Sequence, residues 1–511
     1  MYSKIFAGAV CGVQAYLVSV EVDVSGGLPA FLMVGSLSGE TKESRERVSV
    51  ALKNVGLGLP ASHVTVNLSP ADMRKEGTAF DLPIAIGILE ALGKIPEGST
   101  EGILFLGELG LNGEIKKARG VLPIVRMAQE KNIRQCIVPK SNAQEGGVIP
   151  GITVRGADNI LDVLKFLVAE SGEKEEILPP TTIDMMELWN QEWHMLGPDF
   201  ADVAGQETAK RAAEIAAAGF HNLLMVGPPG AGKSMIAKRI PGILPLLTLE
   251  ESLEVTTVLS VAGQMGPKKS LERKRPFQSP HHTISQPALI GGSAIPRPGA
   301  ISLAHRGILF LDELPEFHRN VLDSLRQPLE ERKVNIARVN GNVTFPSDFM
   351  LICAMNPCPC GYFPDTNRCT CTEPQVRHYV GKVSGPILDR IDLCVEMKAV
   401  DYTSLQGQKQ ECSADIRERV EAARKIQAER FVGTGYRFNG DMDVAVIKKY
   451  CELGSAEQRC MEKLYDALHL SARAYHRILK VSRTIADLSG SEKICEEHLM
   501  EAAFYRPSLD K

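Results

Sequence analysis

The sequence feature that most constrains this chain is a glycine-rich octapeptide between an apolar run at 223–226 and a helical pattern at 235–240. Its residues are Gly227, Pro228, Pro229, Gly230, Ala231, Gly232, Lys233 and Ser234. The glycines let the main chain curl so that successive N–H groups face one anion, and a helix that begins there adds the positive end of its dipole. The pattern therefore predicts a phosphate-binding loop between a buried parallel strand and a helix. A glycine-rich turn that holds no ligand is the alternative.

Two adjacent carboxylates follow another apolar run. The residues from Ile308 to Leu311 predict a buried strand, and Asp312 and Glu313 stand at its carboxyl end, where open α/β sheets bind ligands. With ATP and Mg²⁺ as ligands, Lys233 is expected to reach the β- and γ-phosphates. Ser234 and Asp312 are expected to hold Mg²⁺, the carboxylate through water. Glu313 is expected to orient the attacking water as the base.

Asn356 and a group of cysteines follow the apolar run at 349–355. The amide of Asn356 could bond the γ-phosphate or the attacking water, although an Asn before a Pro is also a common turn former. The cysteines have the spacing Cys-x-Cys, eight residues, Cys-x-Cys: Cys358, Cys360, Cys369 and Cys371. Four thiolates can close a tetrahedral Zn²⁺ site, which would be structural. Free cysteines or a redox-sensitive pair are the alternatives. His281 and His282 are adjacent and are expected to point apart, so we assign them no metal.

The chain of 511 residues is too long for one hydrophobic core, and its pattern changes along its length. Residues 1–169 predict an α+β domain, with Asn112-Gly113 as a hairpin turn. Its other expected elements are strands at 64–68 and 133–138 and helices at 80–92 and 159–167.

Residues 170–198 lack a clear period and predict a linker with one helical turn near Trp189. Residues 199–400 predict a parallel α/β domain, and residues 401–511 an all-helical one. The expected helices of the last domain lie at 416–431, 456–468, 472–488 and 492–504.

The first residues predict a strand. Lys4 and the apolar run at 5–10 faintly resemble a secretion signal, but the run is short and no clean small-residue cleavage site follows. No apolar stretch is long enough to span a bilayer. A cytoplasmic protein without a membrane partner is therefore expected, and its 12 cysteines are not expected to form a disulfide framework.

Several motifs together resemble the YifB/ComM family of AAA+ ATPases, which is related to the magnesium-chelatase ATPase subunit. They are the octapeptide and the segments at 202–206, 279–284, 298–302, 311–314, 354–361 and 385–392. The resemblance covers nearly the whole chain. It implies a central AAA+ α/β domain, a C-terminal helical lid and a homohexameric ring with nucleotide at the subunit interfaces.

The resemblance also implies roles for three polar residues. Asn356 matches the family's sensor-1 position, Arg390 matches the arginine finger that reaches a neighbour's γ-phosphate, and Arg473 matches sensor 2 on the lid. Such cations would stabilise charge on the transferred phosphoryl group. The other interpretation of Arg390 is an ion pair with Asp389 or Asp392.

The net charge of −4 means that any contact with nucleic acid must come from a local basic surface. The long interval from 234 to 312 predicts an extra loop, and the segment at 334–345, with Asn340-Gly341 as its turn, predicts a hairpin. In this family both would face a ring's pore. Basic residues lie in or near them: Lys268, Lys269, Arg273, Lys274, Arg275, Arg297, Lys333 and Arg338. They could track a DNA backbone, or they could be solvated loop charges.

Residues 1–168 resemble the proteolytic domain of Lon-type proteases, which has a ribosomal-S5-like fold. Ala79 occupies the place of the nucleophilic Ser in the segment at 74–81, and no catalytic Lys can be placed at 121–132. Without a hydroxyl or thiol no acyl-enzyme can form, so peptidase activity is not expected. By fold analogy with a recombination protein, this domain is expected to face DNA or to form the ring.

The resemblance to the YifB/ComM family favours an ATP-driven hexameric motor on DNA, a helicase or translocase for branch migration or unwinding in recombination or natural transformation. A chelatase-like motor that remodels a partner for porphyrin metallation is one alternative, and a protein-remodelling ATPase without DNA activity is another.

Overall fold

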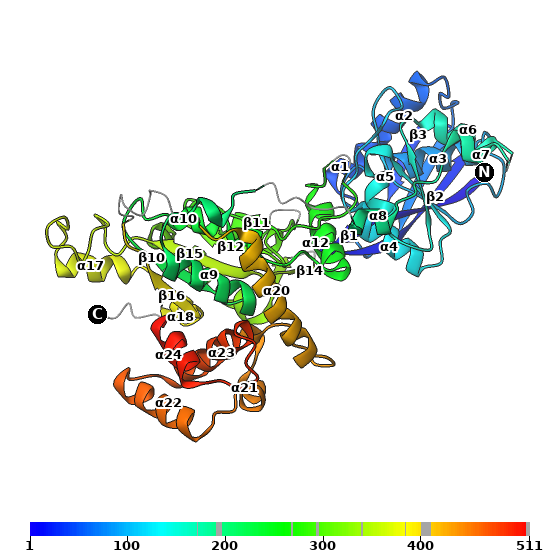
Figure 1. Ribbon diagram of the computed structural model, residues 1–511. Coiled ribbons are helices and arrows are strands. Elements are labelled where there is room, and N and C mark those ends of the chain that lie inside the picture. Colours follow the sequence, from blue (N-terminus) through cyan, green and yellow to red (C-terminus); the bar gives the residue numbers. More distant parts are fainter. Residues whose placement is uncertain are drawn as a thin grey trace.

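The computed structural model describes residues 1–170, 172–190, 197–266, 269–292, 296–338, 341–383, 385–399 and 410–506. An N-terminal α+β part is followed along the chain by an α/β part with a parallel sheet, and then by a helical part (Figure 1). This is the fold class that the sequence predicts. The domain boundaries given above stay predictions.

The N-terminal part is built on a mixed seven-stranded sheet with the order β3-β4-β2-β1-β5-β8-β9. Its strands are β1 (Tyr2–Cys11), β2 (Gln14–Ser25), β3 (Ala30–Val34), β4 (His63–Ser69), β5 (Ile103–Phe105), β8 (Gln135–Pro139) and β9 (Thr153–Ala157). Its helices are α1 (Gly39–Lys42), α2 (Ser44–Asn54), α3 (Asp81–Ala91), α4 (Val121–Glu130), α5 (Lys140–Gly146) and α6 (Ile160–Val168). Helix α3 is buried almost throughout because it packs against β1 and β2.

The expected N-terminal elements are confirmed. The first strand is β1, and the segments at 64–68 and 133–138 fall on β4 and β8. The helices expected at 80–92 and 159–167 are α3 and α6. The turn at Asn112-Gly113 joins a short antiparallel pair, β6 (Glu108–Leu109) and β7 (Ile115–Lys116).

The central sheet is parallel and has the order β11-β12-β15-β10-β16. Its strands are β10 (Leu223–Val226), β11 (Phe277–Gln278), β12 (Ile308–Leu311), β15 (Met350–Met355) and β16 (Leu393–Glu396). Every residue of β10, β12 and β15 is buried, as expected for inner strands of a parallel sheet. Because neighbouring parallel strands end at one edge, the loops that follow them meet there.

Short helices connect these strands. They are α9 (Glu207–Gly219), α10 (Lys233–Ala237), α11 (Ile240–Ile243), α12 (Leu249–Ala262), α13 (Gln286–Ile290), α14 (Ala300–Leu303), α15 (Arg319–Asp323), α16 (Arg326–Glu331), α17 (Glu373–Val380) and α18 (Gly385–Leu388). The hairpin expected at 334–345 is β13 (Lys333–Arg338) and β14 (Gly341–Pro346), while Asn340 of its expected turn lies outside the described residues.

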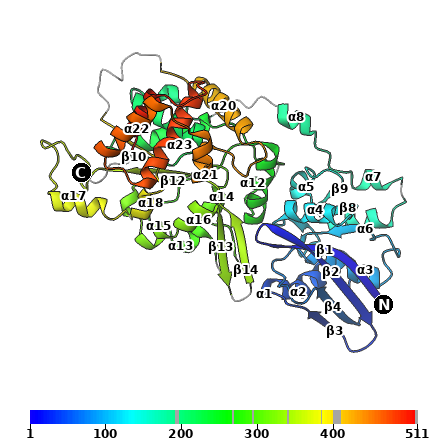
Figure 2. The same cartoon turned by 90° about the horizontal axis from the view of Figure 1, so that it is seen from below.

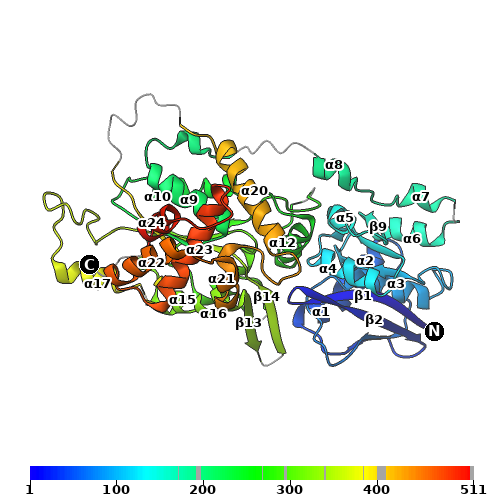
Figure 3. The ribbon, with the colours of Figure 1, turned by 60° about the horizontal axis from the view of Figure 1, so that its bottom comes forward.

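The C-terminal helices pack against the central part and share its core (Figure 3). They are α20 (Ser413–Arg430), α21 (Val444–Tyr450), α22 (Ser455–Ala467), α23 (Ala472–Leu488) and α24 (Glu496–Phe504). Four of them match the expected helices, whereas α21 was not expected. Helices α20 and α23 both contact α9.

The N-terminal part joins the central part through α4, which packs on α12. Gly120 N donates to Ser260 O over 3.0 Å, and the Ser260 hydroxyl bonds the Glu145 carboxylate. Nearby, hairpin β13–β14 lies beside the tip of β1 and β2 (Figure 2), where Gly12 approaches Val343. Between these parts, the turn expected near Trp189 is α8 (Met185–Asn190), and α7 (Lys174–Ile177) precedes it.

Among the described helices, none combines the length and the apolar character needed to cross a membrane.

Candidate active site

The strand order brings three loops to one edge of the central sheet. The phosphate-binding loop follows β10, and β10 lies between β15 and β16. Asp312 and Glu313 follow β12, and Asn356 follows β15. Residues far apart in sequence are therefore neighbours here, which is where ligands bind in open α/β sheets.

The phosphate-binding loop needs its glycines for backbone reasons. Gly232 begins α10 with φ +89°, a left-handed conformation that side chains disfavour. A Cβ on Gly227 would lie 2.6 Å from Met397 O, so β10 and the segment after β16 could not pack as closely with any other residue. The loop therefore keeps its main-chain N–H groups available around the start of α10, as a phosphate cradle requires.

Lys233 is held at the centre of this edge and is only 9 % exposed. Its Nζ donates to Gly227 O over 2.6 Å, to Pro228 O over 3.0 Å and to Asn356 Oδ1 over 3.0 Å. Burial lowers the pKa of the Lys233 ammonium, and the Asp312 carboxylate opposes this shift. Because burial leaves this cation weakly solvated, a polyanionic ligand would stabilise it, and the Asn356 side chain lies beside the same position.

Ser234 and Asp312 present paired oxygens beside Lys233. The Ser234 hydroxyl donates to Asp312 Oδ2 over 2.6 Å, and the other carboxylate oxygen accepts from Glu313 N over 2.9 Å. A hydroxyl and a carboxylate are the hard oxygen ligands that Mg²⁺ prefers when it also binds phosphate. These residues therefore fit a nucleotide with Mg²⁺.

Glu313 lines a cavity of about 590 Å³ together with Asn356 and residues of α17. Its backbone is left-handed, with φ +53°, and its side chain is 57 % exposed. Its carboxylate oxygen Oε2 lies 3.1 Å from His282 Nδ1. The sequence interpretation missed this contact and was wrong in having the two histidines point apart, since the rings of His281 and His282 lie 4.0 Å apart between centroids. The pairing of β11 with β12 brings these segments together.

Arg390 and Arg473 lie together in another place. Arg390 pairs with Glu330 and donates to Pro386 O over 2.6 Å, so the alternative interpretation, an ion pair with Asp389 or Asp392, is wrong. Asp389 instead accepts from Arg473 Nη1 over 2.9 Å. Burial, and then repulsion from Arg326 and Arg473, lowers the pKa of Arg390. Within the described part of the chain, no contact of Arg390 or Arg473 reaches the phosphate-binding loop.

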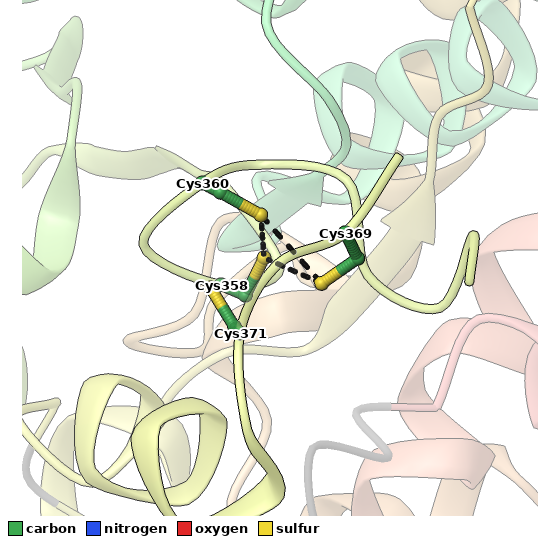
Figure 4. A group of neighbouring side chains, drawn as sticks. All are labelled: Cys358, Cys360, Cys369 and Cys371. Carbon is green, nitrogen blue, oxygen red and sulfur yellow. Dashed lines mark hydrogen bonds between the residues drawn. The ribbon is translucent and has the colours of Figure 1, made fainter. Parts of the chain in front are cut away.

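The four cysteines converge in the loop after β15 (Figure 4). Their sulfur atoms all lie within 4.8 Å of one another, and Cys358 Sγ is 3.4 Å from Cys360 Sγ and 3.8 Å from Cys369 Sγ. Tetrahedral zinc with Zn–S bonds of about 2.3 Å separates its sulfurs by about 3.8 Å, so the group fits zinc. N–H donation from Tyr362 and then Thr370 lowers the pKa of Cys360 to about 6, which favours a thiolate there, whereas burial and the neighbouring sulfurs raise the pKa of Cys369 and of Cys371.

The cysteine loop also touches the phosphate-binding loop. Gly361, with φ +87°, lies so close to Pro229 that a Cβ on Gly361 would be 2.5 Å from Pro229 Cδ. Asn356 precedes Cys358 by only two residues. The fold of the cysteine loop therefore affects the position of Pro229 in the phosphate-binding loop and of Asn356, which bonds Lys233.

Two of the basic residues expected on a pore surface are buried, which corrects that interpretation. Arg275 pairs with Glu251 over 3.0 Å, and Arg273 donates to Leu188 O and to Trp189 O over 3.0 Å. Both guanidiniums thus stabilise the fold. Of the remaining basic residues, four are exposed: Lys269, Lys274, Arg297 and Lys333. Lys268 and the side chain of Arg338 lie outside what the structure describes.

Ala79 lies on the rim of a cavity of about 550 Å³ where the N-terminal part meets the central part. Its neighbour Thr78 bonds the Glu108 carboxylate, and Lys117 also lines the cavity. The position in which a protease would carry its nucleophile therefore holds only a methyl group.

Gln206 is a further residue to which sequence reasoning gave no role. Its Nε2 donates to Ala231 O over 3.1 Å and to Lys398 O over 2.7 Å, so it ties the phosphate-binding loop to the segment after β16. Its only sequence signal was its place in the 202–206 motif.

Comparison with known proteins matches nearly the whole chain to one family. The family model described as magnesium chelatase, subunit ChlI, matches residues 199–405. The models for subunit ChlI of Mg-chelatase and for the ChlI C-terminal region match residues 20–142 and 410–506.

Individual relatives agree with the family models. Competence protein ComM of Haemophilus influenzae is 44% identical over 98% of this chain and 97% of its own length. The protein YifB of Escherichia coli is 42% identical over 99% of this chain and 97% of its own length. Lon protease 2 of Bacillus subtilis is 30% identical over 20% of this chain and 18% of its own length, a likeness limited to one part of each protein.

Proposed function

The chain belongs to the YifB/ComM family of magnesium-chelatase-like AAA+ proteins, and from this premise we propose that it is an ATP-hydrolysing homohexameric motor that acts on DNA. The observation that carries the proposal is a pair of hydrogen bonds at one edge of the sheet. Lys233 donates to Asn356 over 3.0 Å, and the next residue, Ser234, donates to Asp312 over 2.6 Å.

Each residue of this set has a task in phosphoryl transfer. Lys233 binds the β- and γ-phosphates, and Ser234 and Asp312 hold the metal. Mg²⁺, when bound, neutralises charge that develops on the phosphate oxygens. Glu313 accepts the proton of the attacking water. Asn356 orients that water or the γ-phosphate.

Arg390 and Arg473 are proposed to complete the site of a neighbouring subunit. Their contacts lie away from the phosphate-binding loop of their own chain, and Asp389 holds Arg473 beside Arg390. A cation delivered from the next subunit makes hydrolysis depend on ring assembly. This arrangement supports a homohexamer in which each site lies at an interface.

DNA is the proposed substrate of the motor. The name of the H. influenzae relative refers to competence, the uptake of DNA. Lys269, Lys274, Arg297 and Lys333 leave basic side chains exposed on a chain whose net charge is −4. Such a surface would grip the phosphate backbone with little preference for sequence. Branch migration or unwinding in recombination or natural transformation is the activity that we propose, in the cytoplasm.

Two further assignments accompany the motor. We assign structural zinc to Cys358, Cys360, Cys369 and Cys371, because soft thiolate ligands at tetrahedral spacing suit zinc and do not suit hard ions such as Mg²⁺ or Ca²⁺. We assign no peptidase activity to the N-terminal part, because Ala79 offers no nucleophile.

The test is the ATPase rate of the full chain with single-stranded, duplex and branched DNA, measured at 50 and at 200 mM salt. Between these two salt concentrations, a protein that contacts DNA phosphates loses roughly 10³-fold in affinity. DNA is expected to raise the rate, and branched DNA to be resolved only with ATP. Glu313→Gln is the control, since it should still bind ATP. An ATPase rate that none of the three DNAs changes would favour a chelatase-like or protein-remodelling motor. An absence of ATP turnover would refute the motor itself.

A further inference from the structure

Asn222 stands directly before β10, the strand that leads into the phosphate-binding loop. Its main chain is bonded to the segment that enters β16. The carbonyl oxygen of Asn222 accepts from Asp392 N and from Leu393 N, each over 3.0 Å, and Asn222 N donates to Asp392 Oδ2 over 3.0 Å. The start of β10 and the segment that follows Arg390 are therefore joined at this one residue.

The side chain of Asn222 bridges two further segments. Its Nδ2 donates to Arg390 O over 2.8 Å, and its Oδ1 accepts from Leu351 N over 2.8 Å. Leu351 lies in β15, the strand that ends just before Asn356. An asparagine amide supplies both the donor and the acceptor, whereas a carboxylate of the same length would supply acceptors only. The main chain of Arg390 is thus tied to both strands whose far ends meet at the nucleotide site.

Arg390 depends on this main-chain bond because its guanidinium has few other partners. It donates to Pro386 O, four residues earlier in the same turn, and it pairs with Glu330, whose side chain is 63 % exposed. Among the described residues, Nε of Arg390 has no hydrogen-bond partner. An ion pair with an exposed carboxylate holds its partner weakly. The position of the Arg390 main chain therefore sets where the guanidinium can reach.

We propose that Asn222 is a positioning residue for Arg390, and that it sets the place at which each subunit presents this arginine to the γ-phosphate bound by its neighbour. This inference rests on the proposed role of Arg390 in a shared site. Within the described part of the chain, no hydrogen bond of Asn222 reaches the phosphate-binding loop. Loss of its amide should therefore impair the neighbour's site and leave nucleotide binding in its own subunit intact.

The first experiment measures Asn222→Asp in the full chain. Aspartate keeps an oxygen for Leu351 N but offers no N–H to Arg390 O, so only the bond to the arginine is lost. We expect kcat for ATP to fall about tenfold, since a misplacement of about 1 Å costs up to roughly a hundredfold in rate. The affinity for a fluorescent ATP analogue should be unchanged. Asn54→Asp is the matched control and should turn over as the wild type does, because the exposed Asn54 amide also donates to a main-chain carbonyl over 2.8 Å, in the N-terminal part.

Mixtures of variant subunits show which subunit carries the defect. Asn222→Asp subunits keep an intact phosphate-binding loop, and Lys233→Ala subunits keep a correctly held Arg390. Their mixture should recover ATP turnover to about a quarter of the wild-type rate, because about one interface in four of a randomly mixed ring joins the two intact groups. A mixture of Asn222→Asp with Arg390→Ala should not exceed the rate of Asn222→Asp alone, because neither subunit presents a well-placed arginine.

Recovery with Lys233→Ala and none with Arg390→Ala supports the proposal, and every other pattern overturns it. The reverse pattern would mean that Asn222 acts on the nucleotide site of its own subunit. An unchanged kcat or a weakened affinity for the ATP analogue in Asn222→Asp would also overturn the proposal, while the ATPase assignment stood. No recovery in a reference mixture of Lys233→Ala with Arg390→Ala would refute the shared site itself.

Thermal melts of each variant identify any loss that comes from unfolding. If Asn222→Asp melts well below the wild type, Asn222→Ser takes its place in the same mixtures. Its side chain is one bond shorter and loses the reach to Arg390 O, and it adds no charge beside Asp392. The same pattern of recovery is expected with this variant, and the same outcomes would overturn the proposal.

Discussion

Glu254, on α12, anchors the segment that leads into β12. The structure gives the size of the stability loss expected when this carboxylate is removed. Arg306 Nε donates to Glu254 Oε2 over 2.7 Å, and His305 Nε2 lies 3.2 Å from the same oxygen. Burial alone would raise the pKa of Glu254, but the His305 and Arg306 bonds outweigh it and lower the pKa from 4.5 to about 2. At about 1.4 kcal/mol per pKa unit this corresponds to roughly 3 kcal/mol. The side chain is 34 % exposed, so solvent screening leaves about 1 to 2 kcal/mol.

The pH dependence follows from the sign of this shift. A carboxyl whose folded pKa is lowered adds stability that is complete above its unfolded pKa and is lost as pH falls toward the folded pKa. The Glu254 contribution is therefore whole at pH 7, about a quarter smaller at pH 4, and nearly gone at about pH 2. Glu254→Gln should accordingly unfold at lower urea than the wild type, with the gap narrowing in acid.

The measurement is urea unfolding followed by circular dichroism at pH 7, 5 and 4. Glu250→Gln is the control, because Glu250 is an exposed acid on the same helix; its effect should stay within about 0.5 kcal/mol. A Glu254→Gln variant as stable as the wild type at pH 7, or a gap that widens as pH falls, would refute the reasoning.

Three other predictions concern the site. Gly227→Ala would place a Cβ 2.6 Å from Met397 O, so isothermal titration should show ATP affinity reduced at least about tenfold, whereas an unchanged affinity would contradict this packing. Lys233→Ala and Arg390→Ala should each abolish ATP turnover, yet their mixture should recover part of it in a steady-state assay, since one mixed interface then holds both intact groups; no recovery would argue against a shared site. Purified protein should contain about one zinc per chain by mass spectrometry of the metal, and Cys369→Ser should lose most of it; equal zinc in both proteins would exclude the cysteine site.

Contiguous motifs carried most of what could be predicted. The octapeptide and its flanks fix a strand, a loop and a helix within a short stretch, because glycine freedom and the lysine act locally. The apolar run before Asp312 likewise predicts a buried strand, whichever strands become its neighbours in the sheet. Asn356 was placed correctly at the end of a strand for the same reason, although its bond to Lys233 required the strand order.

Contacts between elements could not be predicted because pairing decides them. The basic character of Arg273 and Arg275 is visible in the sequence, but their burial depends on α8 and α12 folding over them. Arg390 has acids beside it in sequence, yet it pairs with Glu330, which the fold brings from α16. His282 meets Glu313 only because β11 lies next to β12. In each case, the spacing of residues along the chain does not reveal which residue from another element the side chain will contact.

The separation of the site into two groups bears on how a motor of this kind can be controlled. Lys233 bonds Asn356 and Ser234 bonds Asp312 within one chain, so we expect nucleotide to bind to a single subunit. Arg390 and Arg473 are bonded elsewhere, to Glu330 and Asp389. For Arg390 to reach a phosphate, its pairing with Glu330 must be exchanged for a more strongly charged partner, and a γ-phosphate is such a partner. Hydrolysis would then follow assembly around bound nucleotide, because the exchange is favourable only where a neighbour already holds ATP.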